Sequence, residues 1–198
     1  MKKILLLLTL PFLLTATLSA CAPVGHPNIL LFTRRFSDIS RKEISVSDFI
    51  IIDGDYKHLF EKDGFCVLLT AEKNEKEELL KIHLSFAKID ENGKERIPTD
   101  AETEFYKEKI CQAMYAFTVK DEDQCRETAE KILPLKSEDF LKTGELTMDK
   151  DNFHLVYYSN KICCRFTVTN TYLEEIESTQ KPVSVPLYGV TANVADEN

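Results

Sequence analysis

Short apolar runs separated by turn-forming residues recur along most of the chain. Runs of this length, rich in β-branched and aromatic residues, predict β-strands. Turn signals such as Asp53-Gly54-Asp55 and Lys62-Asp63-Gly64 mark where these runs end or begin. The predicted strands cover residues 28–33, 49–52, 65–70, 79–89, 153–158, 162–170 and 183–190.

Alternation of apolar and polar residues is strongest between Leu79 and Ile89. Leu80, Ile82, Leu84 and Phe86 share one side of this predicted strand. A period of two over this length predicts a half-buried strand. His83 is therefore expected on the outer side, in contact with solvent.

The clearest hairpin is predicted from the segments 153–158 and 162–170, joined by a turn at Ser159-Asn160-Lys161. Successive side chains of a strand point to opposite faces of the sheet. The neighbouring Cys163 and Cys164 should therefore point apart. Cys164 shares its side with Phe166 and is expected in the core, with Cys163 on the other face.

Helical patterns are few. Residues 101–119 fit a helix and a strand equally well, since Tyr106 and Ile110 recur at helical spacing while Met114 to Val119 reads as a strand. Acidic residues at 121–123 cap a short predicted helix over 124–133, which stops before Pro134. Residues 34–47 are expected to be irregular, and residues 137–144 a loop or a single turn.

Seven or so short strands with one or two short helices predict a mainly β fold. We expect a single β-sandwich, immunoglobulin-like or transthyretin-like, over residues 29–190. Residues 191–198 are expected to be a disordered tail. No internal repeat is visible in the sequence.

The N-terminus follows the pattern of a secretory signal. Lys2 and Lys3 precede an apolar run over residues 4–14, and small and polar residues follow up to Cys21. A membrane-spanning helix needs ~20 mostly apolar residues. The apolar run ends near Leu14, and the prolines and glycine beyond it break a helix. The pattern therefore favours cleavage over an uncleaved span.

The residues Leu18-Ser19-Ala20-Cys21 resemble the lipobox of bacterial lipoproteins. This resemblance implies a signal peptide over residues 1–20, cleavage before Cys21 and a diacylglycerol group on its sulfur. Residues 21–28 then form a lipidated tether. Because residue 22 is Ala and not Asp, the resemblance also implies sorting to the periplasmic face of the outer membrane. An ordinary signal peptide and an uncleaved span remain the alternatives.

The net negative charge of the chain indicates which classes of partner it can bind. The chain has 25 Lys and Arg against 33 Asp and Glu, and loss of Lys2 and Lys3 with the signal takes the net charge from −8 to −10. Nucleic-acid binding depends on basic groups that neutralise phosphates, so nucleic acid is not expected as a partner. An acidic surface suits a basic protein partner, and it also serves solubility alone.

Five cysteines follow Cys21, at positions 66, 111, 125, 163 and 164. In an oxidising compartment such cysteines usually pair, so Cys66, Cys111, Cys125, Cys163 and Cys164 are the disulfide candidates. We expect Cys111 to pair with Cys125, and Cys66 with one of the neighbouring pair. No spacing typical of a zinc site occurs, so no metal is expected.

Motifs of catalysis are missing from the sequence. It has no nucleophile elbow, zinc-protease helix, phosphate-binding glycine loop or dinucleotide fingerprint. We therefore expect no catalytic residues, no small-molecule substrate and no cofactor besides the covalent lipid on Cys21. A binding module is the simplest interpretation.

A second resemblance involves the segments Lys62-Asp63-Gly64-Phe65-Cys66-Val67, Ile110-Cys111 and Phe153 to Tyr157. These segments are similar to those of type VI secretion immunity periplasmic lipoproteins. The resemblance implies that the protein neutralises a toxin delivered to the periplasm by binding it. The alternative is a structural accessory lipoprotein of an outer-membrane secretion or envelope complex.

Overall fold

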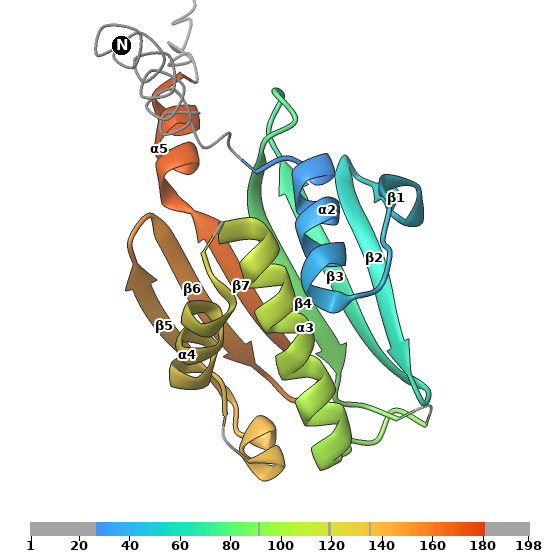
Figure 1. The fold of residues 1–198 in the computed structure, drawn as a ribbon. Coiled ribbons are helices and arrows are strands. Elements are labelled where there is room, and N and C mark those ends of the chain that lie inside the picture. Colours follow the sequence, from blue (N-terminus) through green and yellow to red (C-terminus); the bar gives the residue numbers. More distant parts are fainter. Residues whose placement is uncertain (1–26, 91, 119, 135, 181–198) are drawn as a thin grey trace, which may run out of the picture.

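The computed structural model describes residues 27–90, 92–118, 120–134 and 136–180. Its strands form one seven-stranded antiparallel sheet in the order β1-β2-β3-β4-β7-β6-β5. The fold is therefore mainly β, as predicted (Figure 1). The strands are β1 Ile50–Ile52, β2 Asp55–Lys62, β3 Phe65–Lys73, β4 Leu79–Ala87, β5 Gly144–Lys150, β6 Phe153–Ser159 and β7 Cys163–Asn170.

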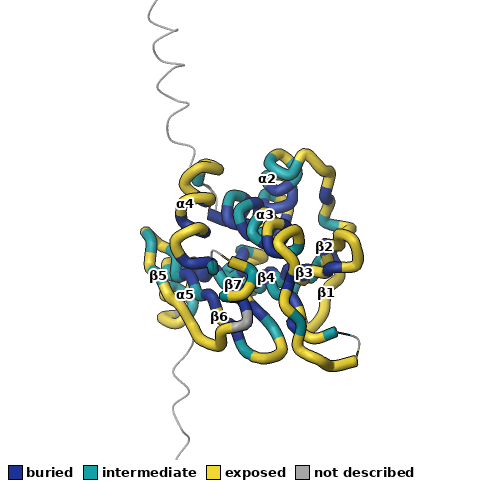
Figure 2. Tube along the Cα trace, turned by 90° about the horizontal axis from the view of Figure 1, so that it is seen from below, coloured by how far each residue is buried: buried dark blue, intermediate teal, exposed yellow. Residues whose placement is uncertain are grey.

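Helices supply the second layer of the fold. The helices α2 (Ile29–Ser40), α3 (Asp100–Thr118) and α4 (Glu122–Ile132) lie on one face of the sheet (Figures 1 and 2). We call the other side of the sheet the open face. The predicted sandwich is not confirmed, because the described strands all belong to one sheet and helices take the place of a second one. The remaining elements are the 3₁₀ helices η1 (Val46–Asp48) and η2 (Ser137–Leu141) and the helix α5 (Thr171–Gln180).

The chain runs through the same topological unit twice. In each half, helical residues precede three antiparallel strands that are neighbours in the sheet: α2 before β2-β3-β4, and α3 and α4 before β5-β6-β7. The first half has in addition the short edge strand β1, between α2 and β2. The halves meet where β4 pairs with β7, with Ile82 opposite Val168. The sequence gives no sign of this repeat, because it lies in the order of elements and not in residue identity.

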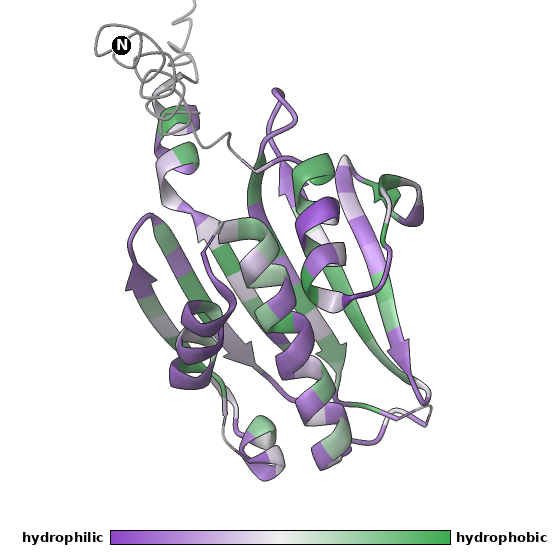
Figure 3. Ribbon diagram, viewed as in Figure 1, coloured by the Kyte–Doolittle hydropathy of each residue, from purple (hydrophilic) through white to green (hydrophobic). Residues whose placement is uncertain are grey.

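The core fills the space between the helices and the sheet. Hydrophobic and hydrophilic residues alternate along the strands (Figure 3). In β3, for example, Phe65, Val67, Leu69 and Ala71 are buried, whereas Cys66 and Leu68 are exposed. One side of the strands β2, β3, β4, β6 and β7 packs under the helices in this way, whereas β5 at the sheet edge is exposed along most of its length.

The first predicted strand, residues 28–33, is wrong: these residues begin helix α2. The side-chain oxygen of Asn28 accepts a hydrogen bond from the backbone N–H of Leu31 at 2.9 Å, which caps the helix. Ile29, Phe32, Thr33 and Phe36 are buried at spacings of three and four. The apolar run over residues 28–33 is long enough for a strand. The buried Phe36 lies in the next segment, residues 34–47, which was expected to be irregular, and it continues the helical spacing of the run.

Other differences concern weakly patterned segments. Residues 101–119, which fitted two structures, form helix α3 up to Thr118. The strands β2 and β5 and the helix α5 were not predicted. The short helix expected over 124–133 is confirmed as α4 with Asp121 as its N-cap, and the single turn expected within 137–144 is η2. The strands at 49–52, 65–70, 79–89 and the hairpin β6–β7 are confirmed in type and position.

The two ends of the chain lie outside the described residues. These include the signal over 1–20, Cys21 of the tether, the strand expected at 183–190 and the tail 191–198. The last two tether residues belong to the domain, because the carbonyl of Pro27 accepts a hydrogen bond from Leu79 N at 2.7 Å and Asn28 bridges to Glu78. Among the helices within residues 27–180 that the structure describes, none has both the length and the apolar character of a membrane span.

Candidate functional site: the α3–α4 groove

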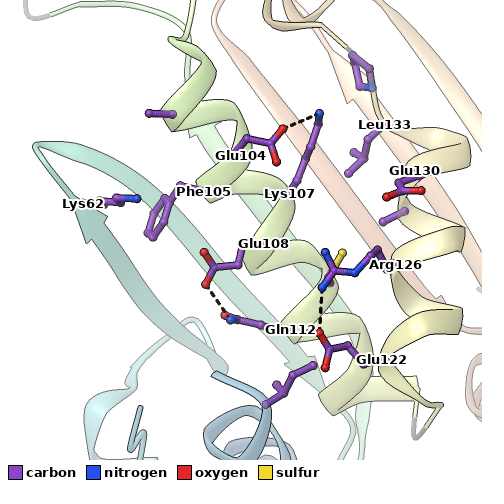
Figure 4. Close-up of a pocket in the computed structure, with 15 residues that line it drawn as sticks. Lys62, Glu104, Phe105, Lys107, Glu108, Gln112, Glu122, Arg126, Glu130 and Leu133 are labelled. Atoms are coloured by element: carbon purple, nitrogen blue, oxygen red, sulfur yellow. Dashed lines mark hydrogen bonds and ion pairs between the residues drawn. The ribbon is translucent and has the colours of Figure 1, made fainter. Parts of the chain in front are cut away.

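A groove of about 380 Å³ lies along the outer side of α3, between it and α4 (Figure 4). We call it the α3–α4 groove. It is lined by Ile39, Lys62, Ala101, Glu104, Phe105, Lys107, Glu108, Cys111, Gln112, Glu122, Arg126, Ala129, Glu130, Leu133 and Pro134. Its volume suits a long side chain or a small molecule.

Local capping fixes both helices that form the walls. Thr99 Oγ1 accepts a hydrogen bond from Glu102 N at 3.2 Å, and a carboxylate oxygen of Glu102 accepts one from Thr99 N at 2.8 Å. These reciprocal bonds make a capping box at the start of α3. At the start of α4, Asp121 accepts a hydrogen bond from Gln124 N at 2.8 Å. The groove walls thus begin at defined residues.

The rim of the groove carries four glutamates and three cationic side chains. Lys107 Nζ lies 3.2 Å from Glu104, and Arg126 donates to Glu122 at 2.9 Å. Two of the three cations are therefore already paired within their own helices (Figure 4).

The remaining rim carboxylates are Glu108 and Glu130. Glu108 accepts hydrogen bonds from Gln112 at 2.8 Å and Lys109 at 2.9 Å, and both Glu108 and Glu130 are exposed. The rim as a whole is slightly acidic.

The floor of the groove is apolar. Phe105, Ala129 and Leu133 are buried there, and Cys111 is half-buried. Burial raises the pKa of the Cys111 thiol to about 11, although the nearby Arg126 acts in the opposite direction. The thiolate is the reactive form of cysteine, so this thiol is unreactive near neutral pH. An apolar floor below charged walls is suited to the aliphatic stem and charged end of a lysine or arginine.

The sequence did not predict this groove. Most of its residues come from two segments. Residues 101–119 fitted both a helix and a strand, and the helix expected over 124–133 could not be positioned next to them from the sequence. The spacing of Glu104 to Glu108 and of Glu122 to Arg126 is one helical turn. Once both segments are helices, this spacing places each pair on one helix side.

The five cysteines named as disulfide candidates are all free in the described structure. Cys164 points into the core, and Cys66 is exposed on the open face, so these two lie on opposite sides of the sheet. Cys163 lies on the open face like Cys66, but β4 runs between their strands. Strands in a sheet are ~4.8 Å apart, so the gap is ~10 Å and too wide for a disulfide. The expected bridge from Cys66 therefore has no support in this fold.

Cys111 and Cys125 lie on the neighbouring helices α3 and α4, and burial is the main reason that the pKa of each thiol lies above its ordinary value. Their bridge stays a prediction. Cys21 lies outside the described residues. In the part of the chain that the structure describes, no group of three or more His, Cys, Asp or Glu is placed to hold a metal.

A second polar cluster lies on the open face and centres on His83. Its Nε2 lies 2.5 Å from Glu72 Oε1, and its Nδ1 lies 2.9 Å from Thr167 Oγ1. Lys81 Nζ is 3.6 Å from the other Glu72 oxygen. His83 points to the outer side, as predicted, but neighbouring side chains hold it in place. The hydrogen bond with His83 is the main reason that the pKa of Glu72 lies below its ordinary value.

This cluster gives a pH-dependent prediction. A lowered folded-state pKa means that Glu72 stabilises the fold above its ordinary value of 4.5, and that this contribution is lost as the pH falls through the folded value. Glu72→Gln should lower the free energy of unfolding at pH 7 by less than about 1 kcal/mol, because the side chain is partly exposed. Urea unfolding at pH 7 and at acid pH measures this, and the difference from wild type should shrink in acid. Glu145→Gln controls for the loss of one charge, and a constant difference would contradict the prediction.

Comparisons with known proteins add no assignment. No protein-family model, no curated protein and no solved structure matches this chain.

Proposed function

We propose that the protein is a lipid-anchored periplasmic binding module that neutralises a secretion-system toxin by binding it. The lipobox Leu18-Ser19-Ala20-Cys21 supports the anchor and the compartment. The similarity of the segments around Phe65, Cys111 and Phe153 to immunity lipoproteins supports the role. In this proposal the protein acts by occlusion and not by catalysis.

The observation that carries the proposal is the α3–α4 groove. Its apolar floor and paired rim form a preformed site in which Glu108 and Glu130 are exposed carboxylates. A basic side chain of a toxin can bury its stem on Phe105 and Leu133 and place its charge near these carboxylates. The acidic charge of the mature chain also accelerates encounter with a basic partner.

A second candidate function is an accessory lipoprotein of an envelope complex, and the edge strand β1 favours it. Ile50 and Ile51 are each 61% exposed, and Ile52 is 43% exposed, at the edge of the sheet. An exposed apolar edge strand is a template for pairing with a strand of another protein. Such pairing would tether this domain within a larger assembly.

Charge reversal tests the groove. The double variant Glu108→Lys and Glu130→Lys is expected to weaken binding of the toxin at least about tenfold, which corresponds to ~1.4 kcal/mol. The toxin is sought among neighbouring gene products by pull-down with the mature domain, residues 22–198. Affinity of the purified pair and protection of cells that receive the toxin in the periplasm are the two measurements.

The matched control carries the same charge change on the edge strand β5, as Glu145→Lys with Asp149→Lys. Both side chains are exposed, and their register opposite Tyr158 and His154 places them on the open face, on the other side of the sheet from the groove. Equal loss of binding in both double variants would show a general charge effect and contradict the groove as the site. If deletion of the gene abolishes secretion and no neighbouring product binds, the accessory role replaces the immunity role.

A further inference from the structure

The start of the described chain is fixed to one end of the sheet. Pro27 is buried, and its carbonyl accepts the hydrogen bond from Leu79 N at 2.7 Å. Asn28 bridges to Glu78 and caps α2. The chain therefore enters the domain beside the turn between β3 and β4, and it has no freedom to enter elsewhere.

Three turns of the sheet lie at this same end. They join β1 to β2 at residues 53–54, β3 to β4 at residues 74–78 and β5 to β6 at residues 151–152, as the strand pairings require. We call this the proximal end. The turn from β2 to β3 at residues 63–64 and the loop at residues 92–94 lie at the distal end (Figure 1).

The covalent distance from Cys21 to this end is short. Five residues lie between Cys21 and Pro27, and the six Cα-to-Cα steps that join these two residues span at most about 22 Å when fully extended. The strand β3 has nine residues, and at ~3.4 Å per residue it is about 30 Å long. The tether is therefore shorter than the sheet along its strands.

We infer that the proximal end faces the membrane surface and that the distal end points away from it. This inference rests on the acylation of Cys21 that the proposed function includes. With Cys21 held at the lipid headgroups, the domain cannot turn over, because the tether is too short to pass along the length of β3. The partner surface is a phospholipid layer.

The charges at the proximal end show whether electrostatic attraction to lipid contributes to this orientation. The turn between β3 and β4 carries Glu75, Glu77 and Glu78 against Lys73 and Lys76, and Lys73 is paired with Glu77. A slightly acidic turn has no attraction for anionic lipid. The orientation therefore comes from tether length alone. It leaves the groove wall at Lys62 and Glu104, near the distal end, open to a soluble partner.

The chain contains no tryptophan, so a single introduced tryptophan reports one position. Lys76→Trp marks the proximal end and Asn92→Trp the distal end, and both side chains are exposed. The variants are expressed from the full-length sequence, and their acylated mature forms are placed in vesicles of phosphatidylethanolamine and phosphatidylglycerol that contain dansyl-labelled phosphatidylethanolamine. Energy transfer should be at least about threefold more efficient from Lys76→Trp, given a separation of ~30 Å between the two ends.

A longer tether is the decisive control. Inserting about 30 Gly and Ser residues after Ala22 gives an r.m.s. span of roughly 30 Å, which matches the length of the sheet. The difference between the two positions should then disappear. Equal transfer with the native tether, stronger transfer from Asn92→Trp, or a difference that survives the insertion would each overturn the inference.

The same samples separate this inference from the proposed function. Mass spectrometry of the full-length protein reports whether Cys21 is acylated. An unacylated Cys21 removes the anchor and the orientation together. If Cys21 is acylated but energy transfer does not favour Lys76→Trp over Asn92→Trp, the inferred orientation is wrong. The proposal of an anchored binding module is not affected by that result.

Discussion

Cys21→Ser is expected to abolish lipid labelling and to move the protein from the membrane fraction to the soluble fraction. Each buried methylene of an acyl chain contributes ~0.8 kcal/mol, and two or more chains hold a protein stably where one holds it marginally. Loss of the acylated sulfur therefore removes the whole anchor. Labelling with a fatty-acid analogue and fractionation of membranes measure the two effects.

The control is Cys66→Ser, because Cys66 is an exposed cysteine of β3 far along the chain from the lipobox. It should keep both the label and the membrane fraction. Unchanged fractionation of Cys21→Ser, or a native polypeptide that still begins with Met1, would remove the lipoprotein assignment and every proposal that depends on the periplasm.

Phe140→Ala is expected to lower the free energy of unfolding by about 3–5 kcal/mol, as large-to-small substitutions of buried aromatic residues do. Phe140 is completely buried, and its ring lies 6.0 Å from Phe86, 6.2 Å from Tyr106 and 6.0 Å from Tyr157, measured between ring centroids. It also fixes η2 to the sheet, because its carbonyl accepts a hydrogen bond from Ser159 Oγ at 3.0 Å. Total stabilities are ~5–15 kcal/mol, so the variant approaches unfolding.

Chemical denaturation of the domain, residues 22–198, measures this effect. Phe140→Leu keeps most of the buried volume and should lose markedly less stability. Tyr158→Ala removes an aromatic ring that is 38% exposed on the open face and should have a small effect. A loss below about 1 kcal/mol for Phe140→Ala would show that η2 is not part of the core.

Phe140 also shows the limit of pattern reading. It lies in a segment expected to be a loop or a single turn, and no periodicity marks a single aromatic residue as buried. Its environment comes from β4, α3 and β6, which are distant in sequence. Local patterns predict the type of an element, whereas burial in a loop depends on contacts between distant elements.

The strands with strong alternation were predicted correctly, and so was the direction of Cys163 and Cys164, because period two determines the face of each residue. Helix α2 was missed because its first residues are four consecutive apolar ones, Ile29 to Phe32. The signals available in the sequence were Asn28, a residue type that favours helix N-caps, and Phe36, which follows Phe32 at helical spacing. The edge strand β5 has only two apolar residues, Leu146 and Met148, and is exposed along most of its length, so its alternation is too short to predict a strand.

The sandwich was predicted because the sequence was expected to hold too few helices to cover a sheet. With α2 and α3 recognised as helices, the same strands need only one helical layer to bury their apolar side. The α3–α4 groove is formed by the packing of two helices in that layer. It could not be predicted from the sequence, because local patterns do not show which helices are neighbours. The proposed lipobox could be predicted without any fold, since signals of this kind are recognised as linear sequence.

The pairing of β4 with β7 has a consequence for folding. It joins two successive units, each of which begins with helical residues and ends with three antiparallel strands. A unit from a second molecule can therefore supply the same backbone hydrogen bonds as the unit from the first. Proteins with such interchangeable parts form swapped dimers when the connecting segment opens. If the proposed lipid anchor holds many copies on one membrane, it raises the local concentration at which this exchange takes place.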